Sequence, residues 1–195
     1  MGVVAISTAL LKRLDTEALA DRKKGLHRPT VAVVIRHIKS GRFLVVMGKK
    51  DYQRGMENPG IVKGGIDSGE HIIDAAYREV AEEIRVSRVD ITMSAYYGTY
   101  SVYSLKKKEN FDRKRYFVFY AKYDGSRTLD VDHNEIVNYT WIKLGDIVRT
   151  LRSLKKMRLG KYKALIKIFT ILRKTKKKHL RKIEQETKLL NASVY

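Results

Sequence analysis

The sequence predicts an α/β fold, and two patterns along the chain carry this prediction. Four segments rich in β-branched and aromatic residues, at 30–37, 42–47, 94–104 and 115–123, are typical of β-strands. Between the second and third of them, an apolar stripe at roughly helical spacing is formed by Ile73, Ala76, Val80 and Ile84. Strands and a helix that alternate in this way are the pattern of an α/β domain.

Composition indicates one compact domain with extensions. The chain has 195 residues, and its 44% hydrophobic content is enough to fill one core. The absence of cysteine excludes disulfides, zinc-thiolate sites and thiol nucleophiles, and it is typical of a reducing compartment, so we expect a cytoplasmic protein. The N-terminal apolar run is interrupted by charges from Lys12 onward and does not resemble a secretory signal. No apolar stretch reaches transmembrane length.

Residues 1–27 are predicted to form a helical extension. A helix at 7–22 would begin with Ser7 or Thr8 as its cap. Its apolar side would carry Leu10, Leu11, Leu14 and Leu19.

The domain itself is expected over 28–150. It begins with a central strand at 30–37, a turn at 39–41 and a returning strand at 42–47. A polar loop at 51–59 then leads to the next motif.

Three glutamates follow at positions that a helix brings together. Glu79, Glu82 and Glu83 stand at i, i+3 and i+4, and a helix of about 100° per residue places them on one face. Like charges at this spacing repel, whereas Mg²⁺ prefers oxygen ligands and commonly bridges them to substrate phosphates. A solvated acidic helix face is the alternative interpretation of these residues alone.

The segment before this helix makes a metal and phosphate site the better interpretation. Gly64, Gly65 and Gly69 permit tight turns and the close approach of a phosphate. Glu70 lies outside the group of three carboxylates. Arg78 is expected to pair with Glu70 or to hold the loop to the helix.

Residues 64–86, GGIDSGEHIIDAAYREVAEEIRV, resemble the Nudix box G-x5-E-x7-R-E-U-x-E-E-x-G-U, in which U is a bulky aliphatic residue. The only fixed letter that differs is the last glycine, which is Arg85 here. Because a non-glycine residue with positive φ costs about 1 kcal/mol, we expect the turn at Arg85 to be reshaped. Val62 stands where many members of the family have proline.

The resemblance implies an α/β/α sandwich around a mixed sheet and an enzyme that hydrolyses a diphosphate linkage in a nucleoside diphosphate joined to another group. It implies that Glu79, Glu82 and Glu83 hold the metal together with Gly64, with Mg²⁺ as the expected cation and Mn²⁺ as an alternative. Lys63 would contact the substrate at the edge of the loop. Water would attack phosphorus, with Glu83 or a carboxylate outside the box as base.

Further candidates lie outside the box. Glu135 precedes Trp141 by six positions, as a glutamate does in several family members, and is predicted to be a ligand or the base. Asp130 and Asp132 are its weaker competitors. Lys49 and Arg54 lie before the box and are predicted to bind distal phosphates, with solvated surface as the alternative.

The strand at 94–104 is expected to end in a basic tip at 106–108 and to pair antiparallel with 115–123. A further short strand is predicted at 138–144. Tyr96, Tyr97, Tyr100 and Tyr103 crowd the first of these strands; strand propensity is the favoured explanation and base stacking the alternative.

Residues 151–195 are predicted to form a basic helical extension. The formal net charge of the chain is +20, and 147–183 contains no Asp or Glu. Amphipathic helical spacing is shown by Tyr162, Leu165, Ile166, Phe169 and Leu172. The predicted nucleic-acid contacts are Lys174, Lys176, Lys177, Lys178 and Arg181. An anionic membrane surface, a nuclear-import patch and a solvated helix packed on the domain are the alternatives.

Two functions from different classes follow. The first is a Mg²⁺-dependent pyrophosphohydrolase acting on RNA 5′ ends or dinucleoside polyphosphates, with inositol pyrophosphates and oxidised nucleoside triphosphates as further alternatives. The second is a nucleic-acid-binding module of the same fold in a larger assembly, with little or no hydrolysis. The glutamates favour the enzyme, because a pure binding module does not need three carboxylates that repel each other. The sequence does not indicate the oligomeric state.

Overall fold

The computed structural model describes residues 3–25, 27–53, 59–108, 111–125, 129–154, 160–175, 181–183, 185–187 and 189. Its helices are α1 (Thr8–Lys23), α2 (Lys49–Tyr52), α3 (Ile72–Ile84), α4 (Leu144–Leu154) and α5 (Gly160–Lys174). Its strands are β1 (Arg28–His37), β2 (Phe43–Gly48), β3 (Pro59–Gly60), β4 (Val62–Gly65), β5 (Ile91–Lys108), β6 (Phe111–Tyr123) and β7 (Ile136–Ile142).

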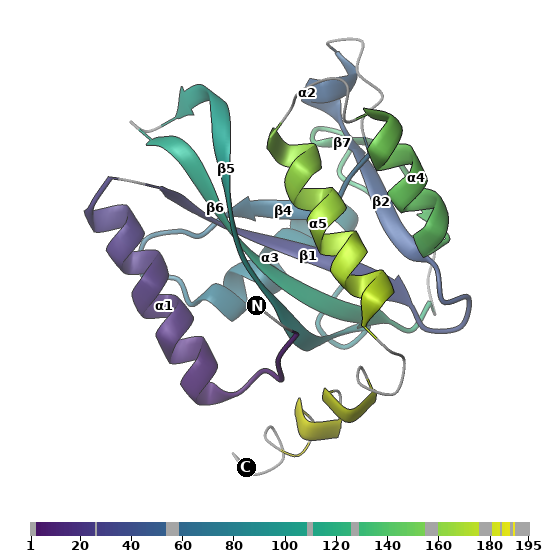
Figure 1. Ribbon diagram of the computed structural model, residues 1–195, viewed down its shortest axis with the longest axis horizontal. Helices are drawn as coiled ribbons and strands as arrows, with labels where there is room; N and C mark the ends of the chain where they lie inside the picture. Colours follow the sequence, from purple (N-terminus) through teal and green to yellow (C-terminus); the bar gives the residue numbers. More distant parts are fainter. Residues whose placement is uncertain are drawn as a thin grey trace.

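The seven strands found among the described residues form one mixed sheet (Figure 1). The strand order is β3-β2-β1-β6-β5, with β4 paired to β1 and β7 paired to β2. β1 and β6 run parallel, whereas the other pairs are antiparallel. The predicted antiparallel pairing of 94–104 with 115–123 is confirmed by β5 and β6.

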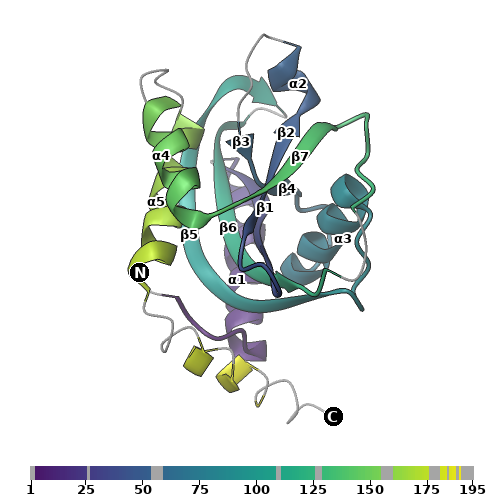
Figure 2. The same cartoon turned by 90° about the vertical axis from the view of Figure 1, so that its right-hand side faces the viewer.

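Two cores lie on the two faces of this sheet. Side chains alternate between the faces of a strand, so Val31, Val33 and Ile35 of β1 join one core while Ala32 and Val34 join the other. Helices α1 and α3 cover the first core, and α4 and α5 cover the second (Figure 2). The α/β/α sandwich around a mixed sheet is therefore confirmed.

Helix α1 confirms the prediction for 7–22, with Ser7 as its N-cap. The Ser7 hydroxyl accepts a hydrogen bond from the Leu10 N–H at 3.2 Å. Leu10 and Leu14 are buried, but Leu19 is 51% exposed, so its predicted place on the apolar side was wrong. The fourth residue after Leu14 is Ala18, and it is Ala18 that is buried, because residues four apart share a helix face.

Three strand boundaries differ from the prediction. Residues 106–108, predicted as a tip, continue β5, because they lie within its paired length. The predicted strand 138–144 is shifted to Ile136–Ile142, and α4 begins at Leu144. The polar loop 51–59 is interrupted, since α2 reaches Tyr52 and Pro59 pairs with Met47.

The tyrosines of β5 are part of the cores. Tyr96, Tyr97 and Tyr100 are all buried, which favours the packing interpretation over base stacking. The side chain of Tyr103 lies outside the described residues.

Helix α5 packs on the sheet through the apolar residues that its sequence spacing predicted. Leu165, Phe169 and Leu172 are buried, and the ring of Phe169 meets that of Phe43 edge-on at 6.2 Å between centroids. Ile166 is partly buried, and the side chain of Tyr162 lies outside the described residues. None of the helices described here is long and apolar enough to cross a membrane.

The C-terminal part of the chain meets the N-terminal segment at β5. Thr187 is buried at this meeting point: its hydroxyl donates to the Ser94 carbonyl at 3.0 Å and accepts from the Ile6 N–H at 3.3 Å. Ile183 is buried as well, in the core that α4 and α5 cover. These contacts attach the C-terminal part of the chain to β5 and to the N-terminal segment.

The packing of α5 predicts that it unfolds together with the sheet. Phe169→Ala should lower the free energy of unfolding by about 3–5 kcal/mol, the usual cost of removing a buried phenylalanine side chain. Chemical denaturation would measure this, with the exposed Arg173→Ala as a control that changes stability by less than about 0.5 kcal/mol. A separate, low-stability transition for α5 with unchanged stability of the rest would contradict the prediction.

Candidate active site

Helix α3 carries the three glutamates, and it buries two of them. Its buried residues include Ala76, Val80 and Ile84 of the predicted apolar stripe, and also Glu79 and Glu83. The side chain of Glu82 is 57% exposed. The three carboxylates therefore differ in exposure: Glu79 and Glu83 lie on the buried side of the helix, and Glu82 faces solvent.

Helix α3 ends at Arg85, which takes the left-handed conformation itself, with φ 54° and ψ 30°. The expectation that the turn is reshaped was therefore wrong, since Arg85 adopts the conformation that favours glycine. Its N–H donates to the Ala81 carbonyl at 3.1 Å and closes the last turn of the helix. The strain of about 1 kcal/mol falls on the backbone of a residue that has no role among the carboxylates.

Glu83 is the most deeply buried of the three carboxylates. Its Oε1 accepts a 3.4 Å hydrogen bond from the backbone N–H of Lys63, while its Oε2 is buried with no hydrogen-bond partner. Burial raises the pKa of Glu83 to about 7, although the nearby charge of Lys63 lowers it. A buried carboxylate oxygen without a partner is costly, and a cation would satisfy it.

Glu79 lies directly against strand β4. A Cβ added to Gly64 would stand 1.8 Å from the Glu79 carboxylate, so only glycine leaves room for this side chain. Burial raises the pKa of Glu79, while its contact with Arg78 lowers it. The pairing of Gly64 with Val31 of β1 fixes the strand against which Glu79 rests.

Arg78 connects α3 to the preceding loop, residues 66–71, which we call the box loop. Its guanidinium donates two hydrogen bonds to Glu70, at 2.8 and 2.9 Å, and one to the Gly65 carbonyl at 2.8 Å. The same group donates to Glu79 at 2.9 Å and to Glu82 at 3.0 Å. Arg78 therefore pairs with Glu70 and also holds the loop to the helix, and its hydrogen bonds lower the pKa of Glu70.

The loop that carries Glu135 reaches the same region. The Asp132 N–H donates to the carbonyl of Glu83 at 3.0 Å, and the Lys49 N–H donates to the carbonyl of Glu135 at 2.7 Å. The negative charge of Glu135 raises the pKa of both Glu79 and Glu83, which places this exposed side chain within electrostatic range of them.

Lys49 contributes to holding this loop as well. Its ammonium donates to the His133 carbonyl at 3.2 Å, so the predicted phosphate contact has a backbone partner in the structure. This role had no signal in the sequence, because 84 residues separate Lys49 from His133.

Other predicted residues lie elsewhere. Lys174 is exposed at the end of α5, which covers the side of the sheet opposite α3, and Arg181 is exposed in the segment that follows. Arg54, Lys176, Lys177 and Lys178 lie outside the described residues.

The donor set fits a hard divalent cation. Among the described residues no three carboxylate or imidazole groups stand as a ready ligand cluster, and Glu79 and Glu82 are ion-paired with Arg78. Even so, the buried Oε2 of Glu83 has no hydrogen-bond partner, and the Glu79 carboxylate packs beside Gly64, so both residues offer the carboxylate oxygens that Mg²⁺ prefers as ligands. Glu79, Glu82 and Glu83 could hold the ion together with Gly64, against which Glu79 packs.

Comparison with known proteins identifies related chains. The family model described as NUDIX domain matches residues 26–167. The RNA pyrophosphohydrolase of Helicobacter pylori is 27% identical over 139 residues, which are 67% of this chain and 86% of that protein. The RNA pyrophosphohydrolase of Caulobacter vibrioides is 42% identical over 65 residues, 33% of this chain and 36% of that protein.

The fold is also similar to that of a solved structure. A Caenorhabditis elegans Ap4A hydrolase in a binary complex superposes with a TM-score of 0.52 at 18% identity, covering 74% of this chain and 95% of that one. At this identity the likeness concerns the fold alone.

The position of Gly64 predicts a steric effect on metal binding. Gly64→Ala should displace the Glu79 carboxylate and weaken Mn²⁺ binding by about 10–100-fold, the usual effect of disturbing the support of a metal ligand. Calorimetric titration with Mn²⁺ would measure it. Gly65→Ala is the matched control, because its Cβ would meet only the end of the Arg28 side chain, at 3.0 Å. Equal Mn²⁺ affinity in the two variants would contradict the prediction.

The raised pKa of Glu83 predicts a pH-dependent stability. Between its ordinary pKa of 4.5 and about 7, the folded metal-free protein binds a proton that the unfolded chain releases. The free energy of unfolding should therefore fall as pH rises through this range, by at most about 1.4 kcal/mol for each pH unit. Denaturation in a chelator at pH 5 to 8 would measure the slope, and Glu83→Gln should reduce it. An unchanged slope in this variant would show that Glu83 is not the group responsible.

Proposed function

This chain belongs to the Nudix hydrolase family and acts on pyrophosphate bonds, and we propose that its substrate is the 5′-polyphosphate end of RNA, cleaved with Mg²⁺. The observation that carries the proposal is the pair of buried carboxylates: Glu79 lies against Gly64, and Glu83 accepts from the Lys63 N–H and is joined at its own carbonyl to Asp132 of the Glu135 loop. A binding module would gain nothing from burying two groups that repel each other.

In this proposal Glu79, Glu82 and Glu83 hold Mg²⁺ together with the Gly64 carbonyl. When bound, the cation neutralises the charge of the diphosphate and lowers the pKa of the attacking water. Arg78 keeps Glu79 and Glu82 at fixed positions relative to the box loop, because it donates hydrogen bonds to both of them and to Glu70 of the loop. Lys63, whose charge acts on Glu83, is the proposed phosphate contact at the edge of the box loop, and Arg54 is proposed to bind distal phosphates.

We assign the proton-accepting role to Glu135. The glutamates of α3 are occupied in holding the cation, whereas Glu135 approaches them from a separate loop that Asp132 and Lys49 anchor. An exposed carboxylate in that position can take the proton of the attacking water and return it to solvent. Glu83 would serve as base only if it did not bind the cation.

Support for RNA comes first from the relatives. The Helicobacter pylori protein, which matches this chain over 139 residues, is named as an RNA pyrophosphohydrolase. A shared fold alone does not define a substrate, so the charge distribution of this chain has to be considered with it.

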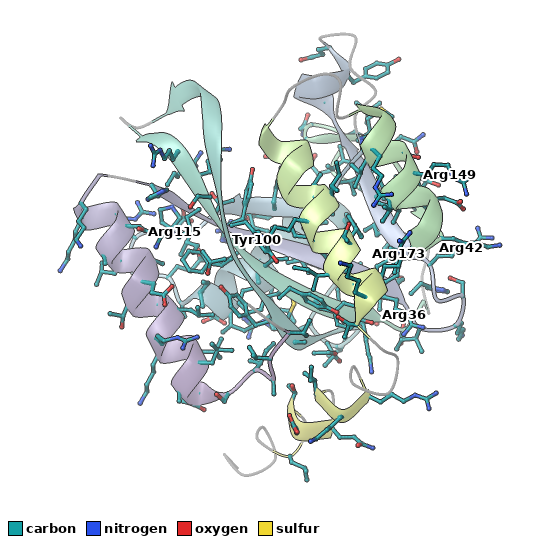
Figure 3. All side chains as sticks on the ribbon, viewed as in Figure 1. Arg36, Arg42, Tyr100, Arg115, Arg149 and Arg173 are labelled. Atoms are coloured by element: carbon teal, nitrogen blue, oxygen red, sulfur yellow. The ribbon has the colours of Figure 1, made fainter. Side chains whose placement is uncertain are left out.

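A basic face gives the second support. Arg36, Arg42, Arg149 and Arg173 lie on one side of the molecule, over the β1–β2 turn, α4 and the end of α5 (Figure 3). The ring contact between Phe43 and Phe169 joins these elements, because Arg42 precedes Phe43 and Arg173 lies one turn beyond Phe169 in α5. We call these four arginines the arginine face. Such a concentration of positive charge attracts polyanions.

The arginine face and the carboxylates differ in location. The carboxylates lie on α3, on one side of the sheet, while α4 and α5 cover the other side (Figure 2). An RNA chain can place its 5′ end at α3 and its backbone on the arginines. Lys174 and Arg181, both exposed, would extend this contact. The lysines at 176–178, which the sequence predicts as nucleic-acid contacts, would extend it further. A cytoplasmic location remains our expectation for such a substrate.

The substrate is tested by hydrolysis of a panel with Mg²⁺: 5′-triphosphorylated RNA, diadenosine polyphosphates, nucleoside triphosphates, nucleotide sugars and inositol pyrophosphates. We expect the highest kcat/KM for RNA and a loss of at least about 100-fold in Glu82→Gln, since a metal ligand contributes several kcal/mol of charge stabilisation. Preferred cleavage of another class, abolished in the variant, would replace RNA as substrate and retain the hydrolase. RNA binding without any hydrolysis would favour the nucleic-acid-binding module.

The same assay tests the arginine face. Arg42→Gln with Arg173→Gln should raise KM for long RNA and reduce the slope of affinity against salt by about one for each phosphate that the arginines no longer neutralise. Turnover of a short substrate should not change. Arg13→Gln with Arg88→Gln removes the same charge elsewhere and is the matched control. If both pairs of substitutions changed KM for long RNA equally, RNA binding would depend on the net charge of the protein and not on the arginine face.

A further inference from the structure

Helix α3 begins without a cap of its own. The N-cap residue, His71, makes no side-chain capping hydrogen bond. Instead, the Ile72 N–H donates to Oδ1 of Asp15, on α1, at 2.7 Å. The other oxygen of Asp15 lies 2.9 Å from Nδ1 of His71. A carboxylate that is 57 residues away in sequence therefore accepts from the first N–H of α3, one of the donors that a helix leaves without an intrahelical partner.

The same face of α1 also binds the start of the box loop. Arg22 donates a hydrogen bond from its guanidinium to the carbonyl of Ile66. Asp15 and Arg22 are seven residues apart, so they share a helix face and are separated by about 10 Å along it. Helix α1 thus spans the box loop from its first residue to the start of α3.

Helix α1 is itself firmly fixed. Leu14 precedes Asp15, Ala18 follows it by three residues, and both are buried in the core that contains Ile72 and Ala76. At the C-terminal end of α1, Asp21 pairs with Arg115 of β6 at 3.0 Å. The two box-loop contacts therefore come from a helix that is attached to the sheet rather than from a loose terminus.

We propose that α1 is a positioning element for the active site, in which Asp15 and Arg22 clamp the box loop and set where α3 places its glutamates. The proposal rests on the metal-binding role given above to Glu79, Glu82 and Glu83. Neither Asp15 nor Arg22 touches the reacting groups, so both are positioning residues.

The geometry of α3 shows why such a clamp matters. Glu79 fits beside Gly64 with no room for even one further carbon atom, so a small shift of the helix moves its carboxylate against β4. Arg78 ties the loop to the helix, but it does not tie either of them to α1. Asp15 and Arg22 provide that second attachment. Both residues precede the region matched by the family model, so the family pattern does not include these contacts.

Packing alone is the competing explanation for α1. Asp15→Ala removes both contacts of the carboxylate, whereas Asp15→Asn keeps an oxygen that can accept from the Ile72 N–H, because asparagine caps helices about as well as aspartate. Glu17→Ala is the matched control, since Glu17 is an acid of the same helix that pairs with Arg13 and not with the box loop.

Two measurements on the full chain test the clamp. Amide hydrogen exchange of the metal-free protein reports on 66–72, and calorimetric titration with Mn²⁺ reports on the glutamates. In Asp15→Ala we expect exchange at these amides and the Mn²⁺ dissociation constant each to rise about fivefold, which corresponds to the ~1 kcal/mol of a helix cap. Asp15→Asn and Glu17→Ala should resemble the wild type.

Unchanged exchange and unchanged Mn²⁺ affinity in Asp15→Ala would refute the clamp. If Asp15→Ala lowers the melting temperature but leaves exchange at 66–72 and Mn²⁺ affinity unchanged, α1 only adds packing and the proposal is wrong. Should Asp15→Ala fail to fold, Arg22→Met, which keeps an apolar side chain, is expected to raise exchange at Ile66 and weaken Mn²⁺ binding. A wild type that binds no Mn²⁺ would refute the proposed metal site, whereas the exchange rates would still decide the clamp.

Discussion

Arg78 donates hydrogen bonds from all three of its guanidinium nitrogens, and the active site is organised around them. Glu70 and the Gly65 carbonyl in the preceding segment accept some of these bonds, and Glu79 and Glu82 of α3 accept the others. A guanidinium keeps its charge at every physiological pH, so it can offset carboxylates that are buried or close together. This group therefore attaches the box loop and α3 to each other beside the carboxylates.

Burying the carboxylates of Glu79 and Glu83 costs free energy, and neighbouring groups of the site offset part of that cost. Each carboxylate loses water, and the charge of Glu79 further raises the pKa of Glu83. The Lys63 N–H donates a hydrogen bond to Glu83 and reduces this cost, and Gly64 leaves the room that Glu79 needs beside β4. In the proposed function, a bound divalent cation would offset both the burial and the mutual repulsion of these carboxylates.

The sandwich separates two kinds of surface. One face of the sheet carries the carboxylates under α1 and α3, and the other carries the arginine face over α4 and α5. Since α5 is packed in the second core, its basic residues are held at fixed positions and do not form a free tail. In the proposed function, this arrangement lets one chain attract a long polyanion on one side and hydrolyse its end on the other.

The sequence by itself determined the elements that depend on local spacing. The strands β1 and β6, the amphipathic face of α5 and the helix that carries Glu79, Glu82 and Glu83 all follow from periodicity, which a chain expresses within a few turns or strands. The box loop and the role of Arg78 could be predicted because Glu70 and Arg78 are only eight residues apart.

Only the tertiary structure decided which groups are buried and which distant groups meet. Periodicity placed the three glutamates on one face but did not show that Glu83 is buried and Glu82 exposed, because that depends on how α3 lies on β4. The contacts of Asp15 with Ile72, of Arg22 with Ile66 and of Lys49 with His133 join residues 44 to 84 positions apart. Such contacts leave no spacing pattern, since they arise from the packing of whole elements and not from the repeat within one.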